Sequence, residues 1–333
     1  MPRRIVVALS LFPLIMFFVS LMLGRYPIAP ETVAQVLLST VFHLEPSWPD
    51  ATADVLFQIR LPRVLLAMLI GAGLAISGAS FQGMFQNPLV SPDILGVTSG
   101  AGFGAALGIL LFGNMAAIQL SALLFGILAV ALAYFISRVY RSTPTLMLVL
   151  SGVVVGAIFS ALISLIKYVA DPYQKLPAIV FWLMGSLSAA STSDLIAAAP
   201  PILLGSLGLL LVRWRINILS LGDEEARSLG VRTDLLKGII IACATLVTAV
   251  GVSVSGIIGW VGLVIPHVGR MLVGPDHRVL LPASVALGAG YLVLIDDLAR
   301  TITTAEIPLG ILTALVGAPF FAYLLRRTKG RWA

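Results

Sequence analysis

Residues Leu219–Val231 read LSLGDEEARSLGV, a short polar island in a chain that is otherwise apolar almost throughout. Gly222 and Asp223 can begin a helix, with Asp223 as the N-cap, and the two glutamates that follow fall where the helix dipole favours negative charge. Gly230 is a natural stop. The pattern predicts a helix of about two turns, which is too short to be stable alone in water and must be held by its flanks and by a partner. A solvated loop is the alternative.

Composition places this island in a polytopic membrane protein. The 333-residue chain is 59% hydrophobic and 11% charged, whereas ordinary globular domains carry roughly 25% charged residues. Apolar runs of about 20 residues recur, each long enough to cross a bilayer as a helix. The alternation typical of a transmembrane barrel is absent from the sequence. We therefore expect an all-α fold of about ten transmembrane helices in one domain, residues 1–333, and no role in nucleic-acid binding.

The ten expected spans follow the apolar runs. They lie at about 5–23, 62–84, 93–112, 115–137, 145–167, 194–212, 235–256, 258–273, 279–297 and 308–326. The first run resembles a signal peptide, but its length and the lack of a cleavage pattern favour a retained span. The eighth is short and carries Pro266, so a break or a tilt is expected. An apolar piece near 177–187 is too short to span and is expected to be re-entrant or interfacial.

The charged residues predict the orientation. With the N-terminus in the cytoplasm, fifteen of the 21 basic residues fall in cytoplasmic segments and six in outer segments, as the positive-inside rule requires. This orientation places both termini and the polar island in the cytoplasm.

The acidic residues bear on the class of transporter. All fifteen are expected in loops or near span ends, with none in the middle of the membrane. Ion-coupled carriers usually place ionisable groups in the bilayer interior, so a secondary transporter is disfavoured, although carbonyls and hydroxyls can also hold sodium. A channel-like or structural membrane subunit is a further alternative.

Motifs for catalysis are missing from the sequence. Gly78 to Gly83 has the spacing of a phosphate-binding loop, but Met84 stands where the lysine is needed. The three histidines are scattered and predict no metal site: His43, His267 and His277. We therefore expect no enzymatic activity, no metal and no cofactor in this chain.

Three segments carry a specific resemblance. The first begins with RLPR at 60–63, includes GAGLAISG at 71–78 and NPL at 87–89, and ends at 96. The second is LGDEEARSLGV at 221–231. The third comprises GWVGLVIPH at 259–267, DHR at 276–278, IPLG at 307–310 and GAP at 317–319. Together they resemble the permease subunit of the FecCD-type ABC importers, which take up iron-siderophores, haem and vitamin B12.

The resemblance implies an assembly. The expected fold is a vitamin B12 permease-like bundle that pairs with a second permease subunit, as a homodimer, in the bacterial inner membrane. Two cytoplasmic ATPase subunits, which bind ATP and magnesium, dock on one side, and a periplasmic substrate-binding protein docks on the other. The cargo implied by the breadth of the family is an iron chelate, either a siderophore or haem. Vitamin B12 and an oxyanion such as molybdate are the alternatives.

The same resemblance makes the polar island a coupling helix that sits in a groove of the ATPase. Ala226 and Leu229 are expected to pack in that groove while the charged residues fix the orientation at its rim. The coupling residues are Gly222, Asp223, Glu224, Glu225, Ala226, Arg227, Ser228, Leu229 and Gly230.

Arginines are expected to dock the binding protein on the outer face. Arg60 and Arg63 flank the outer end of the second span and Arg300 that of the ninth. They match family arginines that receive acidic residues of the binding protein, and a guanidinium pairs bidentately with a carboxylate. Asp296 and Asp297 are expected to orient Arg300. Interfacial anchoring is the alternative role.

A cytoplasmic gate is the last site that the resemblance implies. Its residues are Asn87 and Leu89, between the second and third spans, and Ser142 and Thr143, between the fourth and fifth. Ordinary loop capping is the alternative for both pairs.

Overall fold

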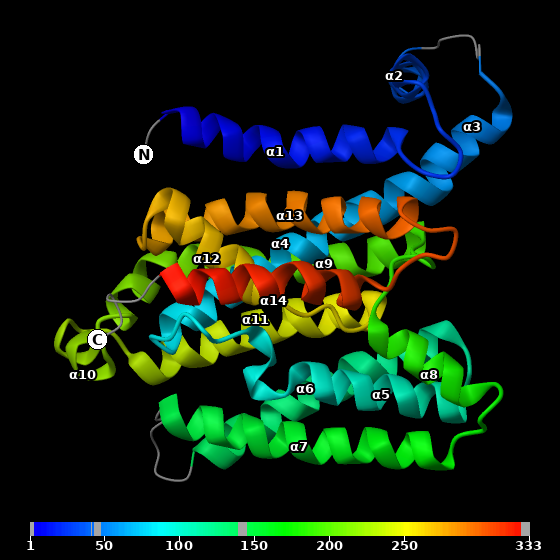
Figure 1. Ribbon diagram of the computed structural model, residues 1–333. Coiled ribbons are helices and arrows are strands. Elements are labelled where there is room, and N and C mark those ends of the chain that lie inside the picture. Colours follow the sequence, from blue (N-terminus) through cyan, green and yellow to red (C-terminus); the bar gives the residue numbers. More distant parts are fainter. Residues whose placement is uncertain (1–2, 41, 43–47, 139–144, 328–333) are drawn as a thin grey trace.

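The computed structural model describes residues 3–40, 42, 48–138 and 145–327, which form helices and no strand (Figure 1). In chain order the helices are α1 (Arg3–Met22), α2 (Pro30–Ser39), α3 (Asp50–Asp54), the π-helical turn η1 (Val55–Arg60), α4 (Leu61–Met84), the 3-10 turn η2 (Pro92–Leu95), α5 (Val97–Leu111), α6 (Met115–Ser137), α7 (Thr145–Val169), α8 (Lys175–Met184), α9 (Thr192–Leu219), α10 (Asp223–Ser228), α11 (Thr233–Ser255), α12 (Val261–Val273), α13 (His277–Thr301) and α14 (Leu309–Arg327). The all-α prediction is confirmed.

The predicted spans correspond one to one with helices. Within the described residues, seven helices are long and apolar enough to cross a membrane. The other three predicted spans are the shorter apolar helices α5, α12 and α14, and the short piece expected near 177–187 is α8. The largest boundary errors are at the second span, whose helical run begins at Asp50 and not at 62, and at α9, which continues to Leu219, two turns beyond the predicted end at 212.

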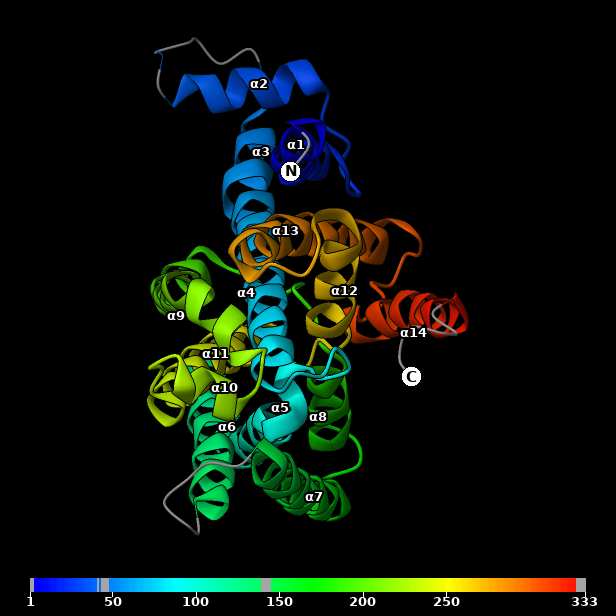
Figure 2. The ribbon, with the colours of Figure 1, turned by 90° about the vertical axis from the view of Figure 1, so that its left-hand side faces the viewer.

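Most helices run side by side along one direction (Figure 1). α1 begins and α14 ends at the same end of the bundle as α10, which we call the α10 end. α2, α3 and α8 lie at the opposite end, the α3 end. Viewed along this direction, α4 and α12 run across the picture, so both are strongly inclined (Figure 2). The tilt expected for the eighth span is therefore present in α12.

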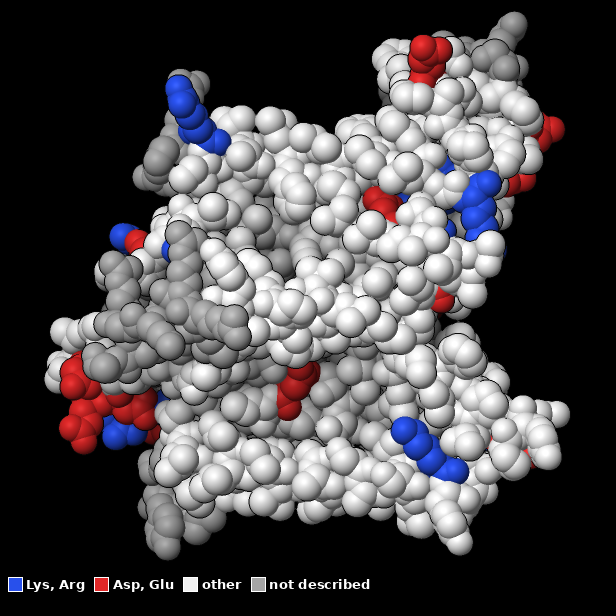
Figure 3. Space-filling view, in the orientation of Figure 1, with Lys and Arg blue, Asp and Glu red and all other residues white. Residues whose placement is uncertain are grey.

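Charge is confined largely to the two ends. Figure 3 shows Lys, Arg, Asp and Glu side chains gathered at the left and right of the bundle, with an almost uncharged surface between them. Exposed leucines such as Leu124, Leu204 and Leu315 contribute to the apolar sides of the bundle. This is the distribution that a bilayer requires.

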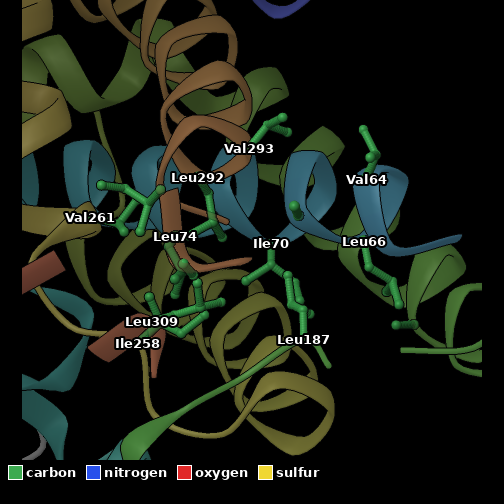
Figure 4. Close-up of a cluster of buried hydrophobic side chains, with 14 of the residues drawn as sticks. Val64, Leu66, Ile70, Leu74, Leu187, Ile258, Val261, Leu292, Val293 and Leu309 are labelled. Carbon is green, nitrogen blue, oxygen red and sulfur yellow. The ribbon is translucent and has the colours of Figure 1, made fainter. Parts of the chain in front are cut away.

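α4 is the central helix of the core. Its side chains Leu66, Ile70 and Leu74 are buried and pack with residues of α12, α13, α14 and two connecting segments (Figure 4). In lipid no hydrophobic effect drives helices together, so close contact between small residues and van der Waals packing stabilise such a bundle.

Two glycines of α4 permit this close packing. A Cβ atom at Gly78 would lie 1.9 Å from the carbonyl oxygen of Gly262 in α12, and one at Gly71 would lie 2.2 Å from that of Gly288 in α13. Both distances are far inside van der Waals contact, and the obstructing atoms belong to backbone. The helix axes can approach this closely only where no side chain is present.

We expect Gly78→Ala to destabilise the protein by about 1–3 kcal/mol or more, because the helices must separate to admit the methyl group. Thermal unfolding of the detergent-purified protein measures this loss. Gly251→Ala is the matched control, since the nearest atom to a Cβ there is 3.6 Å away. An equal response of the two variants would contradict the close-packing argument.

The segment between α4 and α5 corrects the expectation about acidic residues. A Cβ atom at Gly152 would lie 2.0 Å from the carbonyl oxygen of Ile94, so η2 packs about two turns inside α7. Asp93 in η2 therefore lies within the depth of the bundle, and the expectation that no acidic residue does so is wrong. The expected continuous span from 93 is instead a 3-10 turn followed by a helix of 15 residues.

Asp93 lies just before the N-terminus of α5, where a helix dipole stabilises a carboxylate. The acidic residues thus no longer argue against an ion-coupled carrier.

Candidate functional site

The polar island forms α10, a six-residue helix that begins one residue earlier than an N-cap at Asp223 would give. Its N-cap is Gly222, not Asp223, and Gly222 has φ +131°, a conformation that disfavours other residues. A Cβ atom there would also lie 2.1 Å from a carboxylate oxygen of Glu225. The backbone conformation therefore favours glycine at this position, whereas the exposed Glu225 side chain could move to admit a Cβ atom.

The predicted stop at Gly230 is confirmed. Gly230 has φ +82°. Its N–H donates to the carbonyl of Arg227 at 2.9 Å, and that of Val231 donates to the carbonyl of Ala226 at 3.0 Å. These two bonds form a Schellman motif, which satisfies carbonyls that the short helix would otherwise leave without partners.

Two contacts fix α10 to the bundle. Asp223 pairs with Lys237 of α11, whose side chain is almost fully buried and also donates to Thr145 Oγ1 at 3.2 Å. Ala226 is fully buried in a cluster with Ile216 and other apolar residues of the bundle. The expectation that Ala226 packs outward into a partner is therefore corrected: it packs against its own chain.

The opposite face of α10 is open. Glu224, Glu225, Arg227 and Ser228 are exposed, and the Leu229 side chain that follows is 62% exposed. Figure 3 shows acidic and basic groups together at this end. A projecting helix that is anchored on one face and carries two acids and an exposed leucine on the other can dock a protein partner.

Arg63 is the centre of an ion cluster at the α3 end. Its guanidinium donates to both carboxylate oxygens of Asp296, at 2.9 and 2.8 Å, and to both of Glu306, at 3.0 and 2.9 Å. Burial would raise the pKa of Glu306, but the hydrogen bonds and the charge of Arg63 lower it overall. One residue thus joins α4, α13 and the segment before α14.

The other two arginines tie α1 to this cluster. Arg300 forms an ion pair with Asp297, as expected, and donates to the carbonyls of Leu23 and Ser20 at 2.9 and 2.7 Å. Arg60 donates to the carbonyl of Leu21 at 2.6 Å. These contacts hold the end of α1 against η1 and α13.

The burial of the three arginines bears on their predicted docking role. Arg60, Arg63 and Arg300 are only 3%, 7% and 7% exposed. A carboxylate of a partner reaches these guanidinium groups only if it displaces an existing acceptor. Docking at these residues therefore stays a prediction. Glu306 and Ser20, which complete the cluster, were missed because nothing in their local sequence separates them from ordinary loop and helix residues.

The structure describes two of the four predicted gate residues. Asn87 and Leu89 follow α4, and Asn87 Oδ1 accepts from the backbone N–H of Leu89 at 2.9 Å. The capping role considered as the alternative is thus present, while Leu89 itself is 53% exposed. Ser142 and Thr143 lie outside the described residues.

A cavity beside Asn87, with a mainly apolar lining, contains polar residues that the sequence analysis did not select. It is lined by Gln82, Arg270 and His277 among others. These residues come from α4, α12 and α13, so only the fold brings them together. Among the residues that the structure describes, no group of three His, Cys, Asp or Glu side chains could hold a metal ion.

Comparison with known proteins supplies the family. The FecCD transport family signature matches residues 11–327. The chain is 43% identical to the molybdate import system permease protein of Haemophilus influenzae, over 98% of this chain and 96% of that protein. It is 42% identical to a probable iron chelatin transport system permease protein of Helicobacter pylori, over 97% and 98%. The cobalamin import system permease protein of Halobacterium salinarum is 43% identical, over 85% and 76%.

A solved structure agrees with this assignment. It is described as an inward-facing conformation of a putative metal-chelate type ABC transporter. It superimposes with a TM-score of 0.87 at 42% identity, covering 98% of this chain and 100% of the other. The resemblance found in the sequence motifs is confirmed, and the chain belongs to the FecCD transport family of ABC importer permeases.

Proposed function

We propose that this permease works as a homodimer, with two ATPase subunits on the α10 end and a substrate-binding protein on the α3 end. The observation that carries the proposal is α10, a short helix fixed on one face and open on the other. The distribution of basic residues supports a cytoplasmic α10 end in a bacterial inner membrane. Both termini are then cytoplasmic, because α1 begins and α14 ends at this end (Figure 1).

The proposed mechanism is rigid-body alternating access. The partner ATPases bind ATP and magnesium, and their closure moves α10. The ion pair between Asp223 and Lys237 and the burial of Ala226 transmit that movement to α11 and α9. This chain supplies the translocation pathway and the coupling helix, and it carries out no chemistry of its own.

The proposed cargo is an iron chelate, a siderophore or haem. Relatives named for iron chelatin and hemin transport support this choice. Molybdate is the second candidate, favoured by the relative that is 43% identical over 98% of this chain. Cobalamin is the third, on the relative that aligns with 85% of it.

Purification of the tagged chain from its native membrane in mild detergent tests the assembly. We expect a stoichiometric ATPase to accompany it, and a chain that is recovered alone and stable, with no ATPase, would overturn the proposal. Uptake into vesicles that contain the recovered complex and its binding protein then tests the cargo, with labelled ferric chelate, molybdate and cobalamin supplied in parallel. ATP-dependent accumulation of molybdate or cobalamin alone would refute the iron assignment and leave the importer assignment intact.

A further inference from the structure

A cavity where α9, α10 and α11 meet has no part in the mechanism proposed above. It has a volume of about 320 Å³ and lies at the α10 end of the bundle. Its lining combines two cationic side chains with apolar ones: Arg215, Gly230, Val231, Arg232, Leu235, Leu236 and Ile239. A ligand that suits this lining has a negatively charged part and an apolar part.

The two arginines bring uncompensated positive charge to this cavity. Arg215 and Arg232 are both exposed, and neither forms an ion pair with an acidic side chain in the described part of the chain. Asp234, the acidic residue nearest to Arg232 in the sequence, pairs with Arg227 at 3.8 Å. A cleft lined by charge of one sign attracts ligands of the opposite sign. The cavity therefore favours an anionic group.

Arg215 continues a face of α9 that is exposed along the span. Leu204, Leu207 and Leu211 are between 53% and 76% exposed and follow one another at spacings of three and four residues, so they share one face of the helix. Arg215 comes four residues after Leu211 and lies on the same face. Lipid tails are as apolar as leucine and can cover such a face. Trp214 is exposed beside Arg215, and tryptophan is enriched where lipid tails give way to headgroups.

Arg232 has the corresponding position on α11. The residues that follow it on one face, again at spacings of three and four, are Leu235, Ile239, Ala242 and Leu246. Each of the four is exposed or half-buried. The two arginines thus lie at the same end of two neighbouring apolar faces, where long side chains can place their charge among headgroups.

A second cavity lies further along the same face of α11. It has a volume of about 500 Å³, lies between α6 and α11, and has an apolar lining that includes Ala242 and Leu246. Figure 2 shows α6, α9 and α11 together on one side of the bundle. The eleven residues from Leu235 to Leu246 extend about 16 Å, close to half of the roughly 30 Å hydrocarbon core of a bilayer. A charged cavity and an apolar cavity therefore follow one helix face through about one leaflet.

We propose that this surface binds an anionic phospholipid of the cytoplasmic leaflet. The phosphate lies between Arg215 and Arg232, and an acyl chain follows the exposed face of α11 into the apolar cavity. Guanidinium groups pair well with phosphate, and basic pockets between spanning helices on the cytoplasmic side suit lipid headgroups. The proposal goes beyond the proposed function, which requires no particular lipid, and relies on it only to place the α10 end in the cytoplasm.

Thermal unfolding of the purified full-length chain, stripped of native lipid in mild detergent, tests the site. The probe is phosphatidylglycerol, and phosphatidylcholine with the same acyl chains is the reference. A bound lipid stabilises the folded state by mass action. We expect a saturable rise in Tm with phosphatidylglycerol that phosphatidylcholine does not match.

The double variant Arg215→Gln with Arg232→Gln should weaken the apparent affinity for phosphatidylglycerol at least tenfold. Both side chains are exposed, so we expect the variant to fold. Arg4→Gln is the matched control, because Arg4 is an exposed arginine at the same end of the bundle but on α1, which lies apart from α9 and α11 (Figures 1 and 2). It should leave the affinity unchanged.

A variant in the apolar part tests the acyl chain. Ala242 is exposed, so Ala242→Trp places bulk in the path of the chain without disturbing the core. It should weaken phosphatidylglycerol binding at least fivefold. An unchanged affinity in this variant or in the double arginine variant overturns the proposal.

Inorganic phosphate separates a lipid site from a site for free anions. We expect phosphate at the same concentration as the lipid to leave Tm unchanged, because it lacks the apolar part. A rise equal to that with phosphatidylglycerol, or an equal rise with phosphatidylcholine, also overturns the proposal. Because binding is measured without the ATPase and without transport, failure of the lipid site is distinguishable from failure of the importer proposal.

Discussion

Replacing Glu224 and Glu225 together by lysine is expected to abolish ATP-driven uptake while the protein still folds. Both side chains are exposed, and the contacts that fix α10 to the bundle are made by Asp223 and Ala226. The double substitution reverses two charges on the face proposed to meet the ATPase. Like charges across an interface cost several kcal/mol, and 3 kcal/mol corresponds to about a hundredfold weaker association.

Three measurements follow this effect: recovery of the ATPase with the tagged chain, the ATPase rate and uptake into vesicles. The neutral pair Glu224→Gln with Glu225→Gln is the matched control and should retain part of the uptake, since it removes attraction without adding repulsion. Normal uptake by the folded lysine variant would rule out the proposed docking of α10 on the ATPase.

The positions of the spans could be read from the sequence because each depends on local information. Apolar length identifies a span, and a glycine ends α10 because only its own backbone is involved. Asp93 shows where this reasoning fails. A run of apolar residues from 93 to 112 reads as one helix, but close packing against Gly152 turns the chain back inside the bundle before α5 begins.

The candidate sites show a second limit. A helix as short as α10 has two faces, and its sequence does not say which face meets the bundle. Ala226 was therefore assigned to the wrong side, while the exposure of Leu229 agrees with the prediction. The partners of the arginines are more distant still, since Arg63 and Asp296 are separated by 233 residues. Without an indication of which helices are neighbours, such pairs cannot be found.

Replacing Arg63 by methionine is expected to destabilise the protein by about 3–5 kcal/mol, the usual cost of breaking a buried ion pair from one side. Asp296 is 1% exposed, and without Arg63 its remaining ion-pair partner is Arg300 at 3.7 Å. The loss of Arg63 costs less free energy at Glu306, because the Glu306 side chain is 27% exposed and water can solvate it. Unfolding of the purified protein by heat or denaturant measures the loss.

The double variant Arg63→Met with Asp296→Leu should recover most of that stability, because neither charge remains buried without a partner and the apolar side chains can fill the space. A double-mutant cycle gives the coupling between the two residues. Simple additivity of the two substitutions would contradict the buried pair.

The same double variant separates the structural role of Arg63 from the predicted docking role. If Arg63 also receives an acidic residue of the binding protein, the double variant will be stable and yet will lose stimulation of the ATPase by the binding protein. If Arg63 only holds α4 to α13, stimulation will return together with stability. The burial of Arg63 and its four short hydrogen bonds to Asp296 and Glu306 favour the second result. A binding protein that used this guanidinium would have to break bonds already as good as those it could offer, so we expect docking to draw on other exposed groups at this end of the bundle.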